Sequence, residues 1–154
     1  MALDDVDRSI LSELLRDGRM SVSDLAERVH VSRATAYARL QRLRDDGVIR
    51  SIRAEVDPTK LGLPLGAIIL GDVGQASWRQ VRERLLALPG VERLALTSGG
   101  HDFVLMVRAP DLMALRDLVL LKLHDMPEVR TTQTMLLLDE VQPSQADLLA
   151  EAGG

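Results

Sequence analysis

The sequence predicts an α+β protein built from two small domains, and three observations support this prediction. Up to residue 56, apolar residues recur at helical spacing in three separate segments. From residue 66 onward, short aliphatic segments alternate with helical ones, as in a mixed sheet domain. Between these regions, the Pro- and Gly-containing stretch 57–65 interrupts both patterns. We therefore expect a domain over residues 1–56, a linker over 57–65 and a second domain over 66–154.

The composition is ordinary for a soluble globular protein, with 46% hydrophobic and 27% charged residues. The chain has no cysteine, which excludes disulfides and thiolate metal sites. The acidic start of the sequence does not resemble a secretory signal, and the longest apolar stretches are too short to cross a bilayer. We expect a cytoplasmic protein with no cofactor, no metal and no membrane partner.

Three helices are expected in the first domain. The first covers about residues 4–16, and the second covers about 22–29 with Ser21 as its cap. After a short break at His30, Ser32 caps a third helix that runs to about residue 46. The apolar residues of this third helix fall on one side, which we expect to face the scaffold: Ala36, Leu40 and Leu43. Residues 48–56 alternate imperfectly and predict a short hairpin, or wing.

The second domain reads as strand, helix, strand, strand, helix, strand. The expected segments are 66–73, 78–88, 91–98, 101–108, 111–124 and 129–138, with a tight turn at Gly99-Gly100. A βαββαβ order within about 75 residues is typical of the ferredoxin-like split arrangement. A further short helix is possible over residues 143–150.

Positive charge is concentrated in one part of an acidic chain. Seven arginines and two aspartates give residues 28–53 a charge of +5, whereas the formal net charge of the whole chain is −4. Such a local patch is suited to phosphate contact by one element of the structure, although a solvated helix face would look the same.

Two short helices joined by a tight turn, the second rich in arginine, meet the geometric need of a helix that enters the major groove of double-stranded DNA. Arginine matches the O6 and N7 acceptors of guanine, and small residues let a helix approach the bases closely. The expected DNA-binding residues lie on the third helix or, for the last two, on the wing: Ser32, Arg33, Ala34, Thr35, Ala38, Arg39, Arg42, Arg50 and Arg53.

Several stretches of the chain have a recognisable pattern: LDDVDRSILSELLRDGRMSVSDLAERVHVS, an R-L-x-R-L-x-x-x-G-x-I pattern that begins at Arg39, and then VDPTKLG, LTSGGHDFVLMV and VRTTQTMLLLDEV. Through these motifs, in this order, the chain resembles the Lrp/AsnC family of amino-acid-responsive transcription regulators. The resemblance covers roughly nine-tenths of the chain. It implies a winged helix-turn-helix followed by a ferredoxin-like effector and oligomerisation domain. It also implies a homodimer, or a tetramer or octamer built from dimers.

The resemblance also implies an amino acid effector near the Gly-Gly hairpin. An amino acid needs donors for its carboxylate and an acceptor for its ammonium group, which the free amides of the glycines and the Asp102 carboxylate could supply. The expected effector-binding residues are Ser98, Gly99, Gly100, His101, Asp102, Thr132 and Thr134. The family commonly has an acidic residue at position 100 and an aromatic at 101, and a Gly where this chain has His30.

Two His-Asp pairs and one serine could indicate an enzyme instead of a DNA-binding regulator. The pairs His101-Asp102 and His124-Asp125 could suggest a metal phosphohydrolase, and Ser98 near His101 could suggest a hydrolytic triad, but the expected placements do not let these side chains converge. We therefore expect no enzymatic activity. An architectural DNA-binding protein of the same fold, without an effector, stays open as the alternative.

Overall fold

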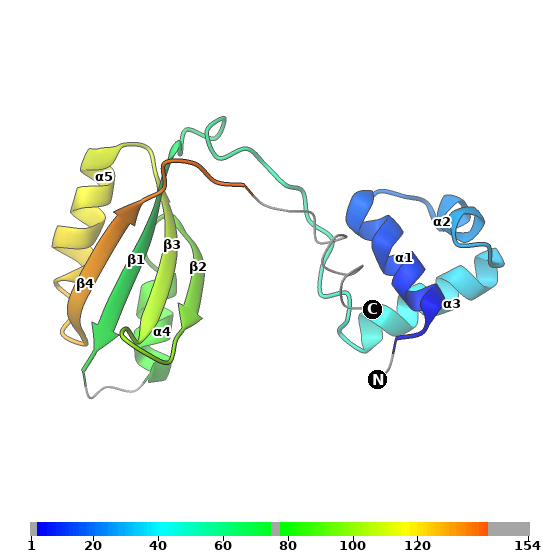
Figure 1. Ribbon diagram of the computed structural model, residues 1–154, viewed down its shortest axis with the longest axis horizontal. Coiled ribbons are helices and arrows are strands. Elements are labelled where there is room, and N and C mark those ends of the chain that lie inside the picture. The colour runs from blue at the N-terminus through cyan, green and yellow to red at the C-terminus, as the bar shows by residue number, and fades with distance from the viewer. Residues whose placement is uncertain (1–2, 75–77, 142–154) are drawn as a thin grey trace. The chain divides into compact units, whose positions relative to one another are not determined.

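A computed structural model of the chain describes residues 3–74 and 78–141. The described residues up to Glu55 form one compact unit, and Val56–Glu140 form a second one. Figure 1 shows helices alone in the first unit, and a sheet with helices in the second. The expected short helix at 143–150 lies outside the described residues.

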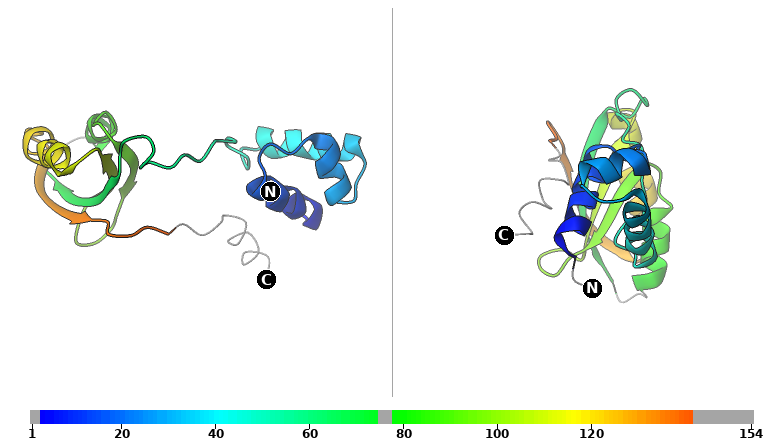
Figure 2. Two further views of the ribbon diagram at one scale, coloured as in Figure 1. Left: turned by 90° about the horizontal axis from the view of Figure 1, so that it is seen from above. Right: turned by 90° about the vertical axis from the view of Figure 1, so that its right-hand side faces the viewer.

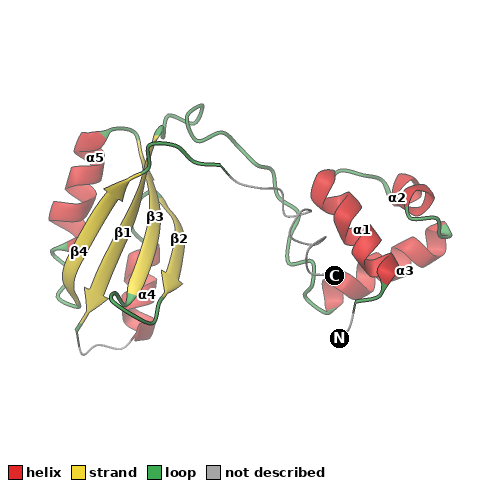
Figure 3. Ribbon diagram, viewed as in Figure 1, coloured by secondary structure: helices red, strands yellow, loops and turns green. Residues whose placement is uncertain are grey.

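The first unit contains the three expected helices (Figure 3): α1 (Asp5–Arg16), α2 (Val22–Arg28) and α3 (Arg33–Asp45). Each helix begins at a side chain that accepts a hydrogen bond from a backbone N–H of its first turn, which would otherwise have no partner. These caps are Asp4, Ser21 and Ser32. The last two are the caps that the sequence predicts.

Aliphatic side chains from all three helices form the core of the first unit. Ile10, Leu25 and Leu43 are its buried centre. Two backbone positions shape the turns around this core. His30, between α2 and α3, has a φ of 55°, the left-handed conformation that histidine tolerates better than most residues. Gly47, with a φ of 71°, ends α3.

The hairpin predicted over residues 48–56 is wrong, since the structure has no strand in this segment. Ile49 packs against the core, but Ile52 and Val56 are 47% and 54% exposed. A two-residue hairpin needs a turn residue such as Gly or Asn, and this stretch has none. The segment instead follows α3 without backbone pairing.

The second unit contains a four-stranded antiparallel sheet with the order β2-β3-β1-β4. Its strands and first helix are β1 (Leu65–Val73), α4 (Trp78–Leu86), β2 (Val91–Leu96), β3 (Phe103–Ala109) and β4 (Val129–Leu136). The helices cover one face of the sheet and leave the other face open (Figure 2). This βαββαβ arrangement confirms the predicted ferredoxin-like architecture.

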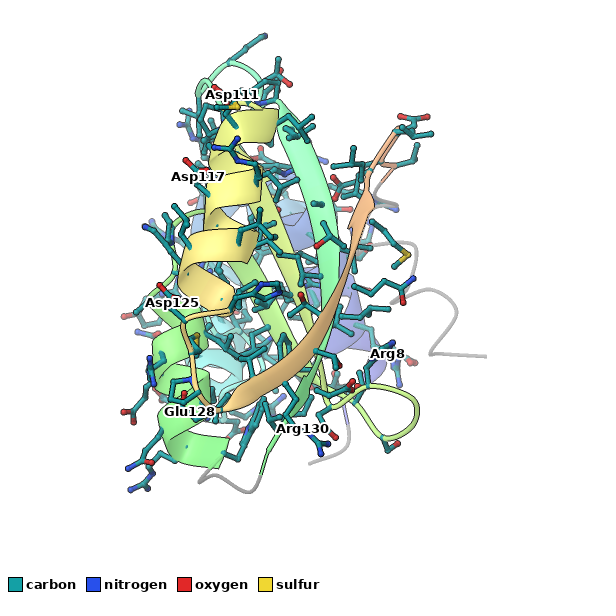
Figure 4. All side chains as sticks on the ribbon, turned by 90° about the vertical axis from the view of Figure 1, so that its left-hand side faces the viewer. Arg8, Asp111, Asp117, Asp125, Glu128 and Arg130 are labelled. Carbon is teal, nitrogen blue, oxygen red and sulfur yellow. The ribbon has the colours of Figure 1, made fainter. Side chains whose placement is uncertain are left out.

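The expected helix over 111–124 consists of two parts: α5 (Leu112–Asp117) and the π-helical turn η1 (Leu118–Leu123). Asp111 caps it, with Oδ1 accepting from the backbone N–H of Ala114 at 2.8 Å. Figure 4 shows Asp111 at one end of this helix and Asp125 beyond the other. Within η1 the wider hydrogen-bonding pattern persists to the end, where the His124 N–H donates to the Val119 carbonyl at 3.2 Å.

Phe103 occupies the centre of the second core, where it is fully buried against the sheet and helices. The neighbouring strand makes room for its ring with a glycine. A Cβ at Gly71 would lie 2.2 Å from Cζ of Phe103, so no other residue fits there without displacement of the ring. This close packing fixes β1 and β3 at the end of the sheet where the β2–β3 connection begins.

The open face of the sheet is largely aliphatic in its middle. Ala67 and Ile69 of β1 point toward the helices and are fully buried, whereas Ile68 and Leu70 alternate to the open side and are half-buried. Their cross-strand partners on β3 and β4 continue this open apolar face with Val104, Met106 and Met135.

Candidate nucleic-acid interface and ligand site

The N-terminal turn of α3 presents polar and small side chains to solvent. Ser32, Arg33, Ala34 and Thr35 are all exposed. The Ser32 hydroxyl accepts from the backbone N–H of Thr35 at 3.1 Å and also contacts the Thr35 hydroxyl at 2.8 Å. This start of the helix therefore combines an ordered cap with a free surface, and one turn later the exposed Ala38 continues the same face.

Tyr37 is a residue of this face that the sequence reasoning missed. Its side chain is 55% exposed, and its hydroxyl accepts a hydrogen bond from Nε2 of Gln41 at 3.2 Å. Together with Val22, Arg33 and Ala34, it lines a shallow hollow between the starts of α2 and α3. The available indication was that the only tyrosine of the chain stands at position 37, among the expected DNA-binding residues.

Arg39 and Arg42 do not lie on the face away from the scaffold, and that prediction is wrong. Both guanidinium groups reach the Asp7 carboxylate of α1, which is 1% exposed: Nη1 of Arg39 at 3.0 Å, and Nη2 of Arg42 at 2.6 and 2.5 Å from its two oxygens. Arg39 also pairs with Asp4. Because a buried carboxylate requires a counter-charge, the two arginines join α3 to α1.

The same network affects the ionisation of Asp4. The hydrogen bond from Arg39, with a second from the backbone N–H of Asp7, lowers the pKa of Asp4 from 3.8 to about 2. The hydrogen bond to Asp4 in turn raises the pKa of Arg39. Both shifts favour the charged forms, so the acidic start of α1 and the arginines of α3 form a persistent ion-pair cluster (Asp4, Asp7, Arg39 and Arg42).

The other expected DNA-binding arginines, Arg50 and Arg53, are exposed on the segment after α3. They stand on an extended segment rather than on a hairpin. Neither forms an ion pair with the described residues, so both remain available for contacts with phosphate.

In the second unit, the β2–β3 connection is longer than the predicted tight Gly-Gly turn. It spans Thr97–Asp102, and the backbone N–H of Thr97 donates to the Asp102 carbonyl at 3.1 Å to close it. Ser98, Gly99 and Gly100 at its tip are exposed. The prediction of a two-residue turn is wrong because β2 and β3 are joined by six residues instead.

Asp102 attaches this loop to the end of β1. Its Oδ2 accepts from the backbone N–H of Val73 at 2.9 Å, and its own N–H donates to the Gly71 carbonyl at 3.0 Å. One oxygen of the carboxylate that the sequence offers for an effector is therefore engaged by the backbone.

Asp72 is a second residue that the sequence reasoning missed. Its carboxylate accepts from the Thr131 hydroxyl and lies 3.2 Å from Nδ1 of His101. The hydrogen bond from Thr131, followed by that with His101, lowers the pKa of Asp72. A carboxylate within the otherwise aliphatic run of β1 was the available indication.

Thr132 and Thr134 do not share the side of the sheet on which Asp72 lies. They pair with Gly71 and Ile69, whose side of the sheet faces the helices. Thr131, which pairs with Asp72, is the β4 residue on the open side. The structure thus brings His101 and Thr131 together around Asp72 and separates the other two threonines from them.

The described residues contain no group of three or more His, Asp or Glu side chains that could hold a metal ion. Across residues 3–74 and 78–141, no helix combines the length and apolar character needed to span a bilayer.

Comparisons with protein families match both units. A family described as "Winged helix-turn-helix DNA-binding" matches residues 3–50, and one described as "Lrp/AsnC ligand binding domain" matches residues 67–147. An HTH-type transcriptional regulator of Pyrococcus abyssi is 40% identical over 135 residues, which are 88% of this chain and 85% of that protein. The regulator AldR of Mycolicibacterium smegmatis is 35% identical over 91% of this chain and 84% of its own.

Solved structures match over nearly the whole chain. A transcriptional regulator of Neisseria meningitidis in complex with L-Met has a TM-score of 0.88 at 27% identity, covering 94% of this chain and 96% of that one. LrpC of Bacillus subtilis has a TM-score of 0.83 at 28% identity, covering 92% and 99%.

Proposed function

Because the chain belongs to the Lrp/AsnC family of DNA-binding transcription regulators, we propose that it binds specific operators through α3 and that an amino acid acting on the second unit changes this binding. The observation that carries the proposal is the exposed face of α3 from Ser32 to Ala38, presented by a three-helix scaffold. Residues 1–56 are assigned to DNA binding, 57–65 to the linker, and 66–154 to ligand binding and assembly. The protein acts in the cytoplasm and catalyses no reaction.

At the operator, the residues of α3 divide into two groups. Ser32, Arg33, Ala34, Thr35 and Ala38 contact bases and the adjoining phosphates, since they are exposed at the start of the helix that enters the major groove. Arg39 and Arg42 act indirectly by holding α3 on α1. In the segment after α3, Arg50 and Arg53 contact the DNA backbone.

For assembly, we assign the open apolar face of the sheet to a homodimer. Ile68, Leu70, Val104, Met106 and Met135 give a self-complementary surface that a second copy would remove from water. A two-fold dimer places two α3 helices on two half-sites, which a single short helix could not bind tightly alone. Sedimentation of the full chain at micromolar concentration should show a dimer or a multiple of it, and a monomer would contradict this assignment.

For the effector, we assign the region around Asp72, His101, Asp102 and Thr131. The Asp72 carboxylate and the free oxygen of Asp102 can accept from an ammonium group, while the exposed amides of Gly99 and Gly100 can donate to a carboxylate. The L-Met bound by the Neisseria meningitidis regulator supports an amino acid as the ligand class.

The alternative is an architectural DNA-binding protein without an effector, and one observation favours it. The loop has neither the acid at 100 nor the aromatic at 101 that the family commonly has, and Asp102 is partly engaged by Val73. Fewer groups are therefore free to bind a ligand.

Calorimetry of the full chain against the twenty amino acids separates these functions. At least one amino acid should bind and change the affinity for an operator selected from random duplexes. Asp72→Asn should weaken that binding about ten- to hundredfold by removing a charge-assisted hydrogen bond. Thr134→Val, on the helix-covered face, is the matched control and should bind as the wild type does. Operator binding without heat from any amino acid would favour the architectural function.

A further inference from the structure

We propose that Tyr37 determines the base sequence that this protein selects: its ring packs on a thymine methyl group, and its hydroxyl donates to an acceptor on a neighbouring base edge. The inference rests on the proposed function of α3 as the helix that enters the major groove. It assigns to Tyr37 a specificity role that the arginines of α3 would otherwise be expected to fill.

The charges of α3 exclude two of its arginines from this role. Nη1 of Arg39 and Nη2 of Arg42 are paired with Asp7, so both guanidinium groups are directed to α1 within the protein. Arg33, which forms no ion pair with the described residues, is the cation left at the start of the helix. Besides Arg33, this exposed face consists of the hydroxyl-bearing side chains of Ser32 and Thr35, the methyl groups of two alanines and the ring of Tyr37.

The shape of this face is suited to close contact with bases. Ala34, Tyr37, Ala38 and Gln41 follow each other at spacings of three, one and three residues, so they share one side of the helix. The alanines on either side of Tyr37 are small, which allows the helix backbone to approach the groove floor and the tyrosine to project beyond its neighbours.

The hollow beside Tyr37 selects the kind of base. Its walls include Val22, Ala34 and the tyrosine ring, so an apolar group fits it better than an amine or a carbonyl. In the major groove the 5-methyl of thymine is the apolar group that a base edge presents. Arg33, at the rim of the same hollow, can contact a guanine or a phosphate next to that thymine.

The hydroxyl of Tyr37 is oriented by Gln41. Because Nε2 of Gln41 donates to the phenol oxygen at 3.2 Å, the phenol proton is directed elsewhere and can donate to a base acceptor such as N7 or O6 of guanine. Gln41 is therefore a positioning residue, which acts through Tyr37.

The experiment uses the full chain and a duplex selected by the wild-type protein from a random pool. Each thymine of the selected duplex is replaced in turn by deoxyuridine, which lacks only the methyl group. Wild-type affinity should fall about fourfold at one position of each half-site, the value of one buried methyl group. Tyr37→Ala should bind the thymine and deoxyuridine duplexes equally at that position.

Further variants separate the ring from the hydroxyl. Tyr37→Phe should keep the response to the methyl group but lose about two- to tenfold in preference for the acceptor base beside it. Gln41→Ala alone should cause part of the same loss of preference for the acceptor base. Combined with Tyr37→Phe, it should cause no further loss. Leu15→Ala, an exposed apolar truncation on α1, is the control and should leave both preferences unchanged.

Two results would overturn the proposal in different ways. In the first, Tyr37→Ala keeps the wild-type response to deoxyuridine at every position, or no replacement of thymine changes the wild-type affinity. Tyr37 then does not select the sequence, although the protein binds an operator. If the pool yields no enriched sequence, sequence-specific binding itself is contradicted, and the role of Tyr37 with it.

Discussion

At the scale of single residues, Asp7 shows how a buried charge can organise a small helical unit. Its side chain is 1% exposed, and the two arginines paired with it come from α3. One of its oxygens also accepts from the backbone N–H of Asp4 at 3.3 Å and completes the capping box of α1. One carboxylate thus caps one helix and anchors another.

We expect Asp7→Asn to lower the free energy of unfolding of the first unit by about 1.5–3 kcal/mol, because its hydrogen bonds lose their charge. Replacing Arg39 and Arg42 together by Met should cost more, about 3–5 kcal/mol, because Asp7 would then be buried without a cation. Hydrogen exchange of the α1 and α3 amides measures both changes.

Arg33→Ala is the matched control for these variants. It removes an exposed arginine of the same helix, so stability should change by less than about 0.5 kcal/mol while operator affinity falls. If the Met variants were instead as stable as the wild type and deficient only in DNA binding, Arg39 and Arg42 would be contact residues after all.

Asp4 makes part of this cluster dependent on pH. Its pKa in the folded protein, about 2, lies below the value of 3.8 for a free carboxyl, so the folded state binds its proton less readily than the unfolded chain. The stabilisation is complete above about pH 4 and is lost as the pH falls toward 2. Asp4→Asn should lack this part of the acid dependence. An NMR titration midpoint for Asp4 near 4 would contradict the ion pair.

At the scale of elements, α3 shows what a pattern in the sequence can and cannot predict. The cap at Ser32 and the buried side chains of Ala36, Leu40 and Leu43 follow from local spacing, and all are confirmed. The direction of Arg39 and Arg42 does not, because it depends on Asp7, 32 and 35 residues away. The hydroxyl–amide pair of Tyr37 and Gln41 likewise requires rotamers that spacing does not give.

The β2–β3 connection of the second unit shows the same limit of prediction from local sequence. Two glycines favour a turn between β2 and β3, but the length of the connection depends on hydrogen bonds between Asp102 and residues of β1 that are distant in sequence. Asp72 becomes a candidate ligand residue only once β4 brings Thr131 beside it. The order of strands could be predicted, whereas the composition of the site required the register of the sheet.

Two glycines with nearly the same backbone conformation give a matched test of packing. Gly47 and Gly90 have φ values of 71° and 73°, but a Cβ would meet nothing within 4 Å at Gly47 and the Arg108 carbonyl oxygen at 2.0 Å at Gly90. Gly47→Ala should cost about 1–2 kcal/mol through its left-handed conformation alone.

Gly90→Ala should cost about 1–3 kcal/mol more, because β2 and β3 must also move apart. Urea unfolding followed by circular dichroism, together with hydrogen exchange at the Arg108 amide, measures the difference. Equal costs for the two substitutions would mean that the approach of the backbone at Gly90 is not tight.

At the scale of the whole molecule, the two units have separate cores and separate tasks. Val81, Leu85 and Phe103 belong to one core and Ile10 and Leu43 to the other. A substitution on the exposed face of α3 therefore leaves the core of the second unit untouched. This separation explains why composition and periodicity were enough to predict the division of the chain into two folds.

The ion pairs between α1 and α3 have a consequence for the ionic atmosphere of DNA. An arginine that is already neutralised displaces no condensed cation from the phosphates. Of the seven arginines between residues 28 and 53, Arg28 pairs with Glu13, and Arg39 and Arg42 pair with Asp7. Four remain: Arg33, Arg44, Arg50 and Arg53.

With about 0.9 counterions released per phosphate contact, these four give a slope of log K against log salt of about −3.6 for each subunit at most, or roughly −7 for a dimer. All seven would give about −13 for a dimer. Operator affinity measured between 50 and 200 mM salt, about a fourfold range, should therefore fall by roughly four powers of ten at most. A slope near −13 would mean that the cluster opens when DNA binds.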